Sequence, residues 1–337
     1  MALRLIELIV PEARGKEMLH SLQEQPLLEC RQIALSNGEA MVRILLNAEQ
    51  SEAVLERLEK SVRSDPANRI LVLPVEATLP RPEPEPAAAS ENPVQVQPTP
   101  EPTDRISREE LYEDIRDAAR CSRVYLGMVV LSSVVATIGL HHNNVAIVIG
   151  AMVIAPLLGP NVALALATTL GDYALARRAL IAGTTGMAAA TLLSLIVGAL
   201  VEVNPALSEV AARTRVNLGD IALALASGCS AALAFTTGLS ATLIGVMVAV
   251  ALLPPLVTFG LLLGGGYPGP AWGALLLFLV NLICVNLSSV VTFVARGIRP
   301  ATWWEKDRAR KATRCAILWW ALLLAALVAT ILLSRRI

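Results

Sequence analysis

Seven long apolar stretches constrain the fold of this chain more than any other feature. They cover residues 124–140, 144–170, 179–201, 216–236, 239–263, 270–294 and 315–333. A helix needs roughly 20 apolar residues to cross the ~30 Å hydrocarbon layer of a membrane, and each stretch has about that length, the first only just. The chain is 55% hydrophobic and only 17% charged, which is too apolar for an ordinary soluble domain. The sequence therefore predicts an α-helical integral membrane protein with about seven transmembrane helices in a lipid bilayer.

The distribution of Lys and Arg predicts which side of the membrane each connection faces. With the amino terminus inside, fourteen of these residues flank the inner ends of the stretches and four flank the outer ends. Connections on the inner side of a membrane carry the excess of positive charge. We therefore expect a multi-pass inner-membrane protein with a cytoplasmic N-terminal region and an outer C-terminus. The net charge is zero, so composition gives no reason to expect nucleic acid as a partner.

Residues 1–77 predict a small cytoplasmic α+β domain. Apolar periodicity indicates strand, helix, strand, strand, helix and strand over residues 3–10, 12–24, 28–36, 39–47, 49–63 and 69–77. Asn37-Gly38 separates the second and third of these strands, and this dipeptide is a strong hairpin signal. The order βαββαβ is typical of a ferredoxin-like domain, which could bind a ligand or form a homo-oligomer. The sequence carries no phosphate loop or His/Cys/Asp cluster that would identify a ligand.

A proline-rich segment separates this domain from the apolar stretches. Residues 78–104 contain eight prolines among Glu, Ala, Gln and Ser, a composition that indicates an extended linker. Ser107, with Glu110 three positions later, has the pattern of a helix capping box. Leu111, Ile115 and Ala119 then recur every four residues. An amphipathic juxtamembrane helix is therefore expected within 105–123.

An internal repeat relates two parts of the apolar region. GAMVIAPLLGP at 150–160 matches GVMVAVALLPP at 245–255 at six of eleven positions, and the same offset of 95 pairs Arg120 with Arg215. Residues 124–201 and 216–294 are therefore interpreted as two transmembrane repeats of three helices, with 315–333 as an additional helix. Because three is an odd number, the second repeat crosses the membrane in the opposite sense. The sequence thus predicts a 3+3 inverted repeat, as in many transporters.

Pro and Gly at corresponding places predict an interrupted helix in each repeat. Non-helical backbone persists inside a membrane only where protein or a water-filled cavity satisfies it, so paired interruptions point to a site near the midplane. Candidate substrate-binding residues lie at these interruptions or carry polar groups on the neighbouring helices: Ser132, Ser133, Gly150, Pro156, Gly159, Pro160, Asn161, Ser227, Gly245, Pro254, Pro255, Asn281, Asn286 and Ser289. In the alternative interpretation the prolines only kink packed helices, and the polar side chains only hold helices together.

Ionisable residues are expected near the helix ends. Asp220 follows Arg215 in the first turn or so of the fourth stretch. The two could form an anchoring ion pair or act as a gate. His141-His142-Asn143-Asn144 indicates a polar turn rather than a metal site, because no acidic or cysteine partner is near in sequence. The five cysteines have no metal-type spacing and are expected to be small buried apolar residues. No cofactor is predicted.

The stretch from GL at 139 through GAMVIAPLLGPNVALAL at 150, GD at 171 and VALLPPLVTFG at 250 resembles a bacterial and archaeal membrane family catalogued as domain of unknown function 389. The resemblance extends over roughly 105–295. It implies a multi-helix membrane core, in some members joined to an extra soluble domain. It implies no particular activity.

We expect a transporter or channel for a small polar solute or ion. The absence of a carboxylate deep in any stretch favours uniport, a channel or sodium coupling over proton exchange. The alternative is a sensor or scaffold that does not transport and whose soluble domain binds a ligand or partner. An intramembrane enzyme is not expected, because no zinc motif, Ser-His pairing or aspartyl pair lies at membrane depth.

Overall fold

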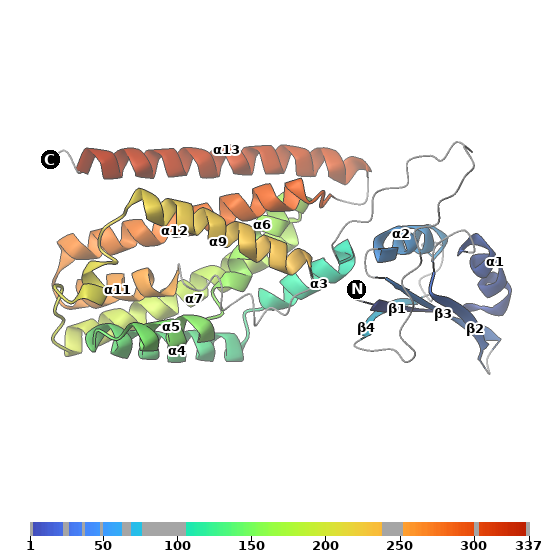
Figure 1. Cartoon of the computed structure of the whole chain (residues 1–337), viewed down its shortest axis with the longest axis horizontal. Helices are drawn as coiled ribbons and strands as arrows, with labels where there is room; N and C mark the ends of the chain where they lie inside the picture. Colours follow the sequence, from blue (N-terminus) through green and yellow to red (C-terminus); the bar gives the residue numbers. More distant parts are fainter. Residues whose placement is uncertain are drawn as a thin grey trace, which may run out of the picture. The chain divides into compact units, whose positions relative to one another are not determined.

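The computed structural model describes residues 3–22, 27–35, 38–47, 50–62, 69–75, 106–237, 252–299 and 303–334 (Figure 1). The chain divides into two compact units, Met1–Leu111 and Tyr112–Ile337. The expected proline-rich linker and Gly245 lie outside the described residues.

The first unit contains a four-stranded antiparallel sheet. Its elements are β1 (Leu3–Pro11), α1 (Glu12–Leu22), β2 (Glu29–Ala34), β3 (Glu39–Asn47), α2 (Ser51–Val62) and β4 (Arg69–Val75). The strand order is β2-β3-β1-β4, and every neighbouring pair is antiparallel. The expected βαββαβ order is present, with β3 between β1 and β2. Gly38 has a φ of 74°, the left-handed conformation that a tight hairpin turn between β2 and β3 requires.

One face of this sheet forms the core of the first unit. Burial alternates along β1 because successive side chains point to opposite faces of a strand. Ile6 on β1 and Ile44 on β3 are fully buried and belong to one cluster with Met18 of α1 and Val54 of α2. The alternating pattern of the sequence thus specifies which face both helices cover.

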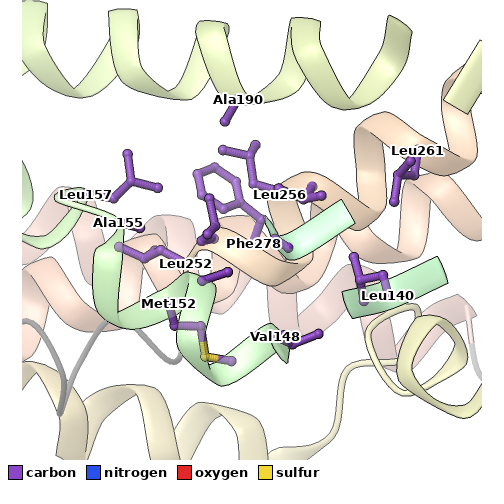
Figure 2. Packing of buried hydrophobic residues seen from close by; sticks show 14 of the residues in the cluster. Leu140, Val148, Met152, Ala155, Leu157, Ala190, Leu252, Leu256, Leu261 and Phe278 are labelled. Atoms are coloured by element: carbon purple, nitrogen blue, oxygen red, sulfur yellow. The ribbon is translucent and has the colours of Figure 1, made fainter. Parts of the chain in front are cut away.

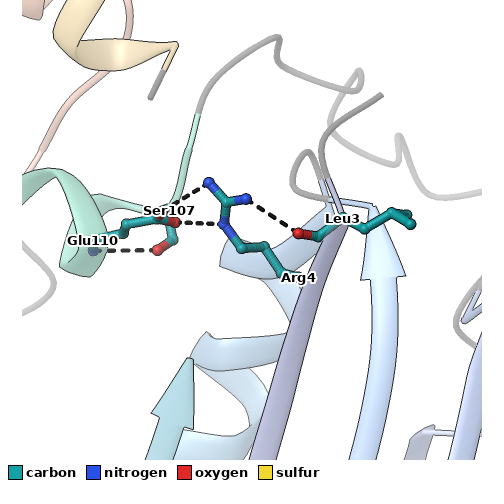
Figure 3. Close-up of polar contacts among 4 residues, drawn as sticks. All are labelled: Leu3, Arg4, Ser107 and Glu110. Carbon is teal, nitrogen blue, oxygen red and sulfur yellow. Dashed lines mark hydrogen bonds and ion pairs between the residues drawn. The ribbon is translucent and has the colours of Figure 1, made fainter. Parts of the chain in front are cut away.

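An ion pair between Arg4 and Glu110 joins β1 to the first turn of α3 (Arg108–Ala118) within the first unit. Arg4 Nε and Nη2 donate to the two carboxylate oxygens of Glu110 at 2.9 and 2.7 Å (Figure 3). Ser107 Oγ accepts a hydrogen bond from the Glu110 amide at 3.3 Å, as a capping box requires. The carboxylate of Glu110 is bound to Arg4, so only one half of the expected capping box forms.

The second unit begins with the rest of α3. The expected apolar face is present, since Ile115 and Ala119 are buried. Tyr112 Oη donates to Asp172 Oδ2 at 2.7 Å. Partial burial, followed by the hydrogen bond and charge of Asp172, raises the pKa of Tyr112 to about 12. The hydroxyl therefore remains a donor to Asp172 over the whole physiological pH range.

Helices make up the rest of the second unit. They are α4 (Arg123–His141), α5 (Val145–Ile154), α6 (Leu158–Leu170), α7 (Tyr173–Leu200), α8 (Ser208–Ala211), α9 (Leu218–Thr236), α11 (Leu253–Gly264), α12 (Pro268–Ala295) and α13 (Trp303–Ser334). By length and composition α4, α7, α9 and α12 could each cross a membrane, and α5 with α6 would make a fifth span. This is compatible with a multi-pass membrane protein. The expected fifth stretch is described only as the shorter α11, and the apolar part of α13 is also short, so seven spans are not established.

Helices of the two expected repeats begin at equally spaced positions. α4 begins at Arg123 and α9 at Leu218, and α6 begins at Leu158 and α11 at Leu253, a spacing of 95 positions in both cases. α7 and α12 follow with the same spacing, and each has 28 residues. The packing also corresponds: α6 packs on both α7 and α12, and α11 packs on the same two helices.

The turns that follow α6 and α11 have the same conformation, and they are separated by the same spacing as the starts of the two helices. Gly171 after α6 and Gly266 after α11 have φ angles of 71° and 83°. The amide that follows each glycine bonds back into its helix, from Asp172 to Ala167 O at 2.9 Å and from Tyr267 to Leu262 O at 2.8 Å. A glycine in the left-handed conformation is the usual way to close a helix with this bond.

The cysteines are less buried than the sequence suggested. Cys284 is buried, Cys30 and Cys229 are partly buried, and Cys121 and Cys315 are exposed. Helices at a protein surface in a membrane present apolar side chains outward, so an apolar helix does not imply that each of its residues is inside the bundle.

Replacing Gly171 or Gly266 by alanine should lower the free energy of unfolding by roughly 1–2 kcal/mol each, since a side chain with a Cβ is strained in the left-handed conformation. Gly150→Ala is the matched control, because a Cβ at Gly150 in α5 would meet open space. It should be neutral or slightly stabilising. Unfolding of the purified protein in mixed detergent micelles measures all three. Equal stability of the three variants would contradict this account of the turns.

Candidate functional site

The centre of the candidate site is a break between α5 and α6. Ala155 ends α5 by donating its amide to Ala151 O at 3.2 Å, and α6 begins at Leu158 with its axis bent by 50°. The expected interruption is present, but it lies at residues 155–157. Pro156 is therefore inside the break, whereas Gly159 and Pro160 lie within the first turn of α6.

The prolines begin half-helices rather than kink longer ones. Pro160 is the third residue of α6, and Pro255 is the third residue of α11. The first amides of a helix have no acceptor within it, so proline loses no hydrogen bond there and its fixed φ suits the first turn. Pro160, Pro254 and Pro255 are all buried. Pro160 and Pro255 therefore lie in the first turns of α6 and α11.

Two asparagines, one on α6 and one on α12, meet beside the break. Asn161 Nδ2 on α6 donates to Leu157 O at 2.8 Å, which satisfies a carbonyl at the break. Asn286 Nδ2 on α12 donates to Asn161 Oδ1 at 3.1 Å and to Leu282 O at 2.9 Å. The structure therefore brings together two of the residues that the sequence proposed for the site.

This network fixes the orientation of both amides. Leu157 O and Leu282 O can only accept, so each must face an Nδ2. Asn161 Oδ1 then accepts from Asn286, and Asn286 Oδ1 points away from the bonded pair. Asn286 is fully buried, and its Oδ1 has no hydrogen-bond partner among the described residues. A buried acceptor without a donor is costly, which makes this oxygen available to a ligand.

Apolar side chains fill the space between the half-helices. Ala155 and Leu157 at the break belong to one buried cluster with Leu252 and Leu256 of the α11 segment and Phe278 of α12. Figure 2 shows Leu157, Leu252, Leu256 and Phe278 grouped together, with Leu140 and Leu261 at one end of the cluster. We call Leu157, Leu252, Leu256 and Phe278 the apolar plug. Each of the four is at most 5% exposed.

A small cavity lies at the end of this cluster. Its volume is about 130 Å³, and it opens between the ends of α4 and α7 and the connection after α7. Leu140 and Leu261 line it and also belong to the buried cluster. Polar groups come from His141, His142 and Asn204. The cavity thus borders one end of the buried cluster, and the four plug residues do not line it.

The serines among the candidate residues bond to backbone. Ser132 and Ser133 donate to Val129 O within α4, and Ser289 on α12 donates to Gly228 O on α9 at 3.1 Å. Ser227 is partly buried on α9. Asn281 is 6% exposed. It lies five residues before Asn286, which places it on a different side of α12. Of these bonded serines, only Ser289 joins two helices, whereas Ser132 and Ser133 bond within α4.

The candidate glycines have different surroundings. A Cβ at Gly159 would collide with the backbone of Ala118, so this glycine permits close packing of α6 on α3. Gly150 faces open space and makes no such approach. Gly245 lies outside the described residues. Neither described glycine provides a ligand position at the break.

Asp220 has a local structural role. Its carboxylate accepts the amide of Asn217 at 2.7 Å, and the two residues form a capping box at the start of α9. Arg215 is exposed. No ion pair joins Arg215 to Asp220 in the part of the chain that the structure describes, so the anchoring pair expected from the sequence does not form.

The residues around His141 form a polar turn. Asn144 Oδ1 caps α5 by accepting the Ile147 amide at 3.2 Å, and Asn143, at a φ of 52°, accepts from Ser208 and from the Glu209 amide. The described residues contain no group of three or more metal-ligating side chains. This agrees with the turn predicted from the sequence.

Sequence reasoning missed the apolar plug and Thr258. Leucines and a phenylalanine inside an apolar stretch carry no signal that separates a plug from a lipid-facing side chain. Thr258 of α11 is fully buried, and its Oγ1 has no hydrogen-bond partner among the described residues. Its position in an otherwise apolar run, VALLPPLVTFG, was the available signal.

Comparisons with known proteins place the chain in a family. Residues 152–287 match the model of a family described as "Domain of unknown function (DUF389)". An uncharacterized protein of Methanocaldococcus jannaschii is 36% identical over 291 residues, which cover 86% of this chain and 87% of the relative. No solved structure matches the chain. The matched segment contains the break, both asparagines and α11, and the chain belongs to this DUF389 family.

Proposed function

We propose that this protein is a transporter or channel for a small polar solute or ion in the inner membrane, with its substrate path between α6 and α11. The observation that carries the proposal is the Asn161–Asn286 pair, which leaves a buried acceptor oxygen beside a broken helix. A buried oxygen without a donor lowers the stability of the fold, and a ligand that donates a hydrogen bond to it would remove this cost. Polar groups at such breaks are typical of transport sites.

The inverted repeat is part of this proposal. The equal spacing of α4 with α9, α6 with α11 and α7 with α12 supports a duplication, as do the two matching turns at Gly171 and Gly266. If each repeat crosses the membrane three times, the halves have opposite orientation, and α6 and α11 begin near the midplane from opposite sides. The N-terminal domain is then cytoplasmic, as the distribution of positive charge suggests.

The apolar plug provides the gate of the proposed path. A narrow apolar constriction excludes water and ions until its side chains move apart. The cavity at Leu140 and Leu261 borders the buried cluster that contains the plug, and in this proposal the substrate approaches from that end. The plug contains no charged group, so the proposal favours uniport, a channel or sodium coupling over proton exchange. The N-terminal domain could regulate the opening.

A second candidate function is a membrane sensor or scaffold without transport. The observation in its favour is the tight packing of the plug, together with the burial of Pro160, Pro254 and Pro255. In that case the first unit binds a ligand or partner, and the helices only anchor or oligomerise the protein.

Flux measurements separate the two candidates. If the protein is a transporter or channel, purified protein in liposomes should conduct at least one member of a panel of neutral polar solutes and monovalent ions. Folded protein without flux for any of them favours the sensor.

Leu256→Ser should increase flux by about tenfold, because the serine hydroxyl allows water into the plug. A tenfold increase requires the free-energy barrier to fall by only ~1.4 kcal/mol. Leu223→Ser is the matched control, because Leu223 lies on α9 with 57% of its surface exposed. Solute-induced swelling and ion conductance of liposomes measure both variants. A Leu256→Ser protein that is folded and as tight as the original would contradict the plug.

Asn286→Leu should abolish flux, because it removes the free acceptor oxygen while keeping a similar volume. Since Asn161 would lose a donor, the double variant Asn161→Leu/Asn286→Leu removes both polar partners and avoids an unpaired amide. Thr169→Val is the control: Thr169 is buried on the same helix as Asn161, and its hydroxyl donates within that helix. Unchanged flux in the folded double variant would rule out the asparagines as the site.

A further inference from the structure

A polar crevice lies at the end of α3, away from the break. Its volume is about 540 Å³, and its lining comes from the last turns of α3, the residues before α4 and the second turn of α7. Three guanidinium groups, on Arg116, Arg120 and Arg178, line it. We call it the arginine crevice.

Two of these arginines are free to bind an anion. Arg116 Nη1 contacts both carboxylate oxygens of Glu113 at 2.7 and 2.9 Å, so this pair is neutral overall. Arg120 and Arg178 are exposed, and neither side chain has a hydrogen bond or ion pair within the part of the chain that the structure describes. Asp117 is the remaining carboxylate in the lining. Two free cations against one anion leave the crevice positive.

The crevice lies at the border of an apolar surface. Val124, at the start of α4, is 71% exposed, and Leu180 and Ile181 of α7 are 51% and 46% exposed. Leu180 follows Arg178 by two positions. Exposed apolar side chains of this kind are covered by hydrocarbon chains in a membrane protein. A ligand in the crevice would therefore have charge on one side and apolar surface on the other.

We propose that the arginine crevice binds the phosphate group of an anionic phospholipid, whose acyl chains lie on the exposed apolar surface of α4 and α7. Arginine presents a planar fork of donors that matches two phosphate oxygens, and two such forks can hold one headgroup. Basic pockets at the end of membrane helices commonly bind anionic headgroups. The site does not depend on the transport proposal, because it shares no residue with the break or the plug.

Native mass spectrometry of the purified full-length protein tests this. Delipidated protein is titrated with phosphatidylglycerol, with phosphatidylcholine and with inorganic phosphate in separate experiments. The tested variant is Arg120→Gln/Arg178→Gln, and Arg177→Gln is the matched control, because Arg177 is a neighbouring exposed arginine outside the crevice lining. Circular dichroism and the elution volume establish that each variant is folded. Arg120→Lys/Arg178→Lys keeps the charge but removes the planar fork.

Phosphatidylglycerol should bind the original protein and Arg177→Gln alike, and bind the double Gln variant about tenfold more weakly. The double Lys variant should be intermediate, and phosphatidylcholine should bind weakly to all. Equal binding of phosphatidylglycerol to the original and the double Gln variant would overturn the proposal. Binding of inorganic phosphate with no preference for the anionic lipid would also overturn it, since the crevice would then accept a soluble anion.

Discussion

The hydrogen bonds that join Leu157, Asn161 and Asn286 connect the break between α5 and α6 to α12, and the arrangement of the candidate site depends on them. Asn161 Nδ2 donates to Leu157 O, at the start of α6, at 2.8 Å. Asn286 Nδ2 donates in turn to Asn161 Oδ1 at 3.1 Å. Amides buried among apolar side chains need such partners, because an unpaired polar group is costly there. The Asn161–Asn286 bond therefore ties together helices whose bonded residues are 125 positions apart in sequence.

α6 and α11 correspond in their ends and in their packing. α6 and α11 both begin with a buried proline at the third position, and both end at a glycine with positive φ. Each packs on α7 and on α12, so each half contributes to the surroundings of the other. This exchange of partners is what the proposed duplication leads us to expect. The asparagine pair breaks the equivalence, because the position of Asn161 corresponds to Leu256 and that of Asn286 to Thr191. Only one of the two asparagines thus has an apolar counterpart, and the Asn–Asn hydrogen bond has no equivalent at the corresponding positions.

Much of the fold could be predicted from the sequence, because its local patterns are strong. The alternation of apolar and polar residues predicted β1 and β3, and the Asn-Gly dipeptide predicted the hairpin. The internal sequence match predicted that α6 and α11 correspond to each other. Pro156 was correctly placed in the break, whereas Gly159 and Pro160 lie in the first turn of α6. Proline marks a helix start as readily as a helix interruption, and the sequence alone does not separate the two. The partners of the Glu110 and Asp220 carboxylates were predicted wrongly. In the folded chain Glu110 accepts from Arg4 and Asp220 accepts from the Asn217 amide, and the sequence alone does not show which partner is chosen. For the candidate site, the two asparagines were recognisable as polar groups in apolar stretches. The plug leucines were not recognisable, because an apolar sequence does not show which side chains pack against a neighbouring helix and which face lipid.

Two halves of opposite orientation require that equivalent ends of α4 and α9 lie on opposite sides of the membrane. Arg120→Cys and Arg215→Cys, made separately in a background where the five native cysteines are replaced by serine or alanine, test this directly. Both positions are exposed, polar and three residues before the start of α4 or α9, so a maleimide that does not cross membranes can reach them from water. Inverted halves predict that the reagent labels Arg120→Cys only from the cytoplasmic side and Arg215→Cys only from the outer side of membrane vesicles of known orientation. Labelling of both cysteines from the same side would contradict the inverted repeat and the transport path built on it.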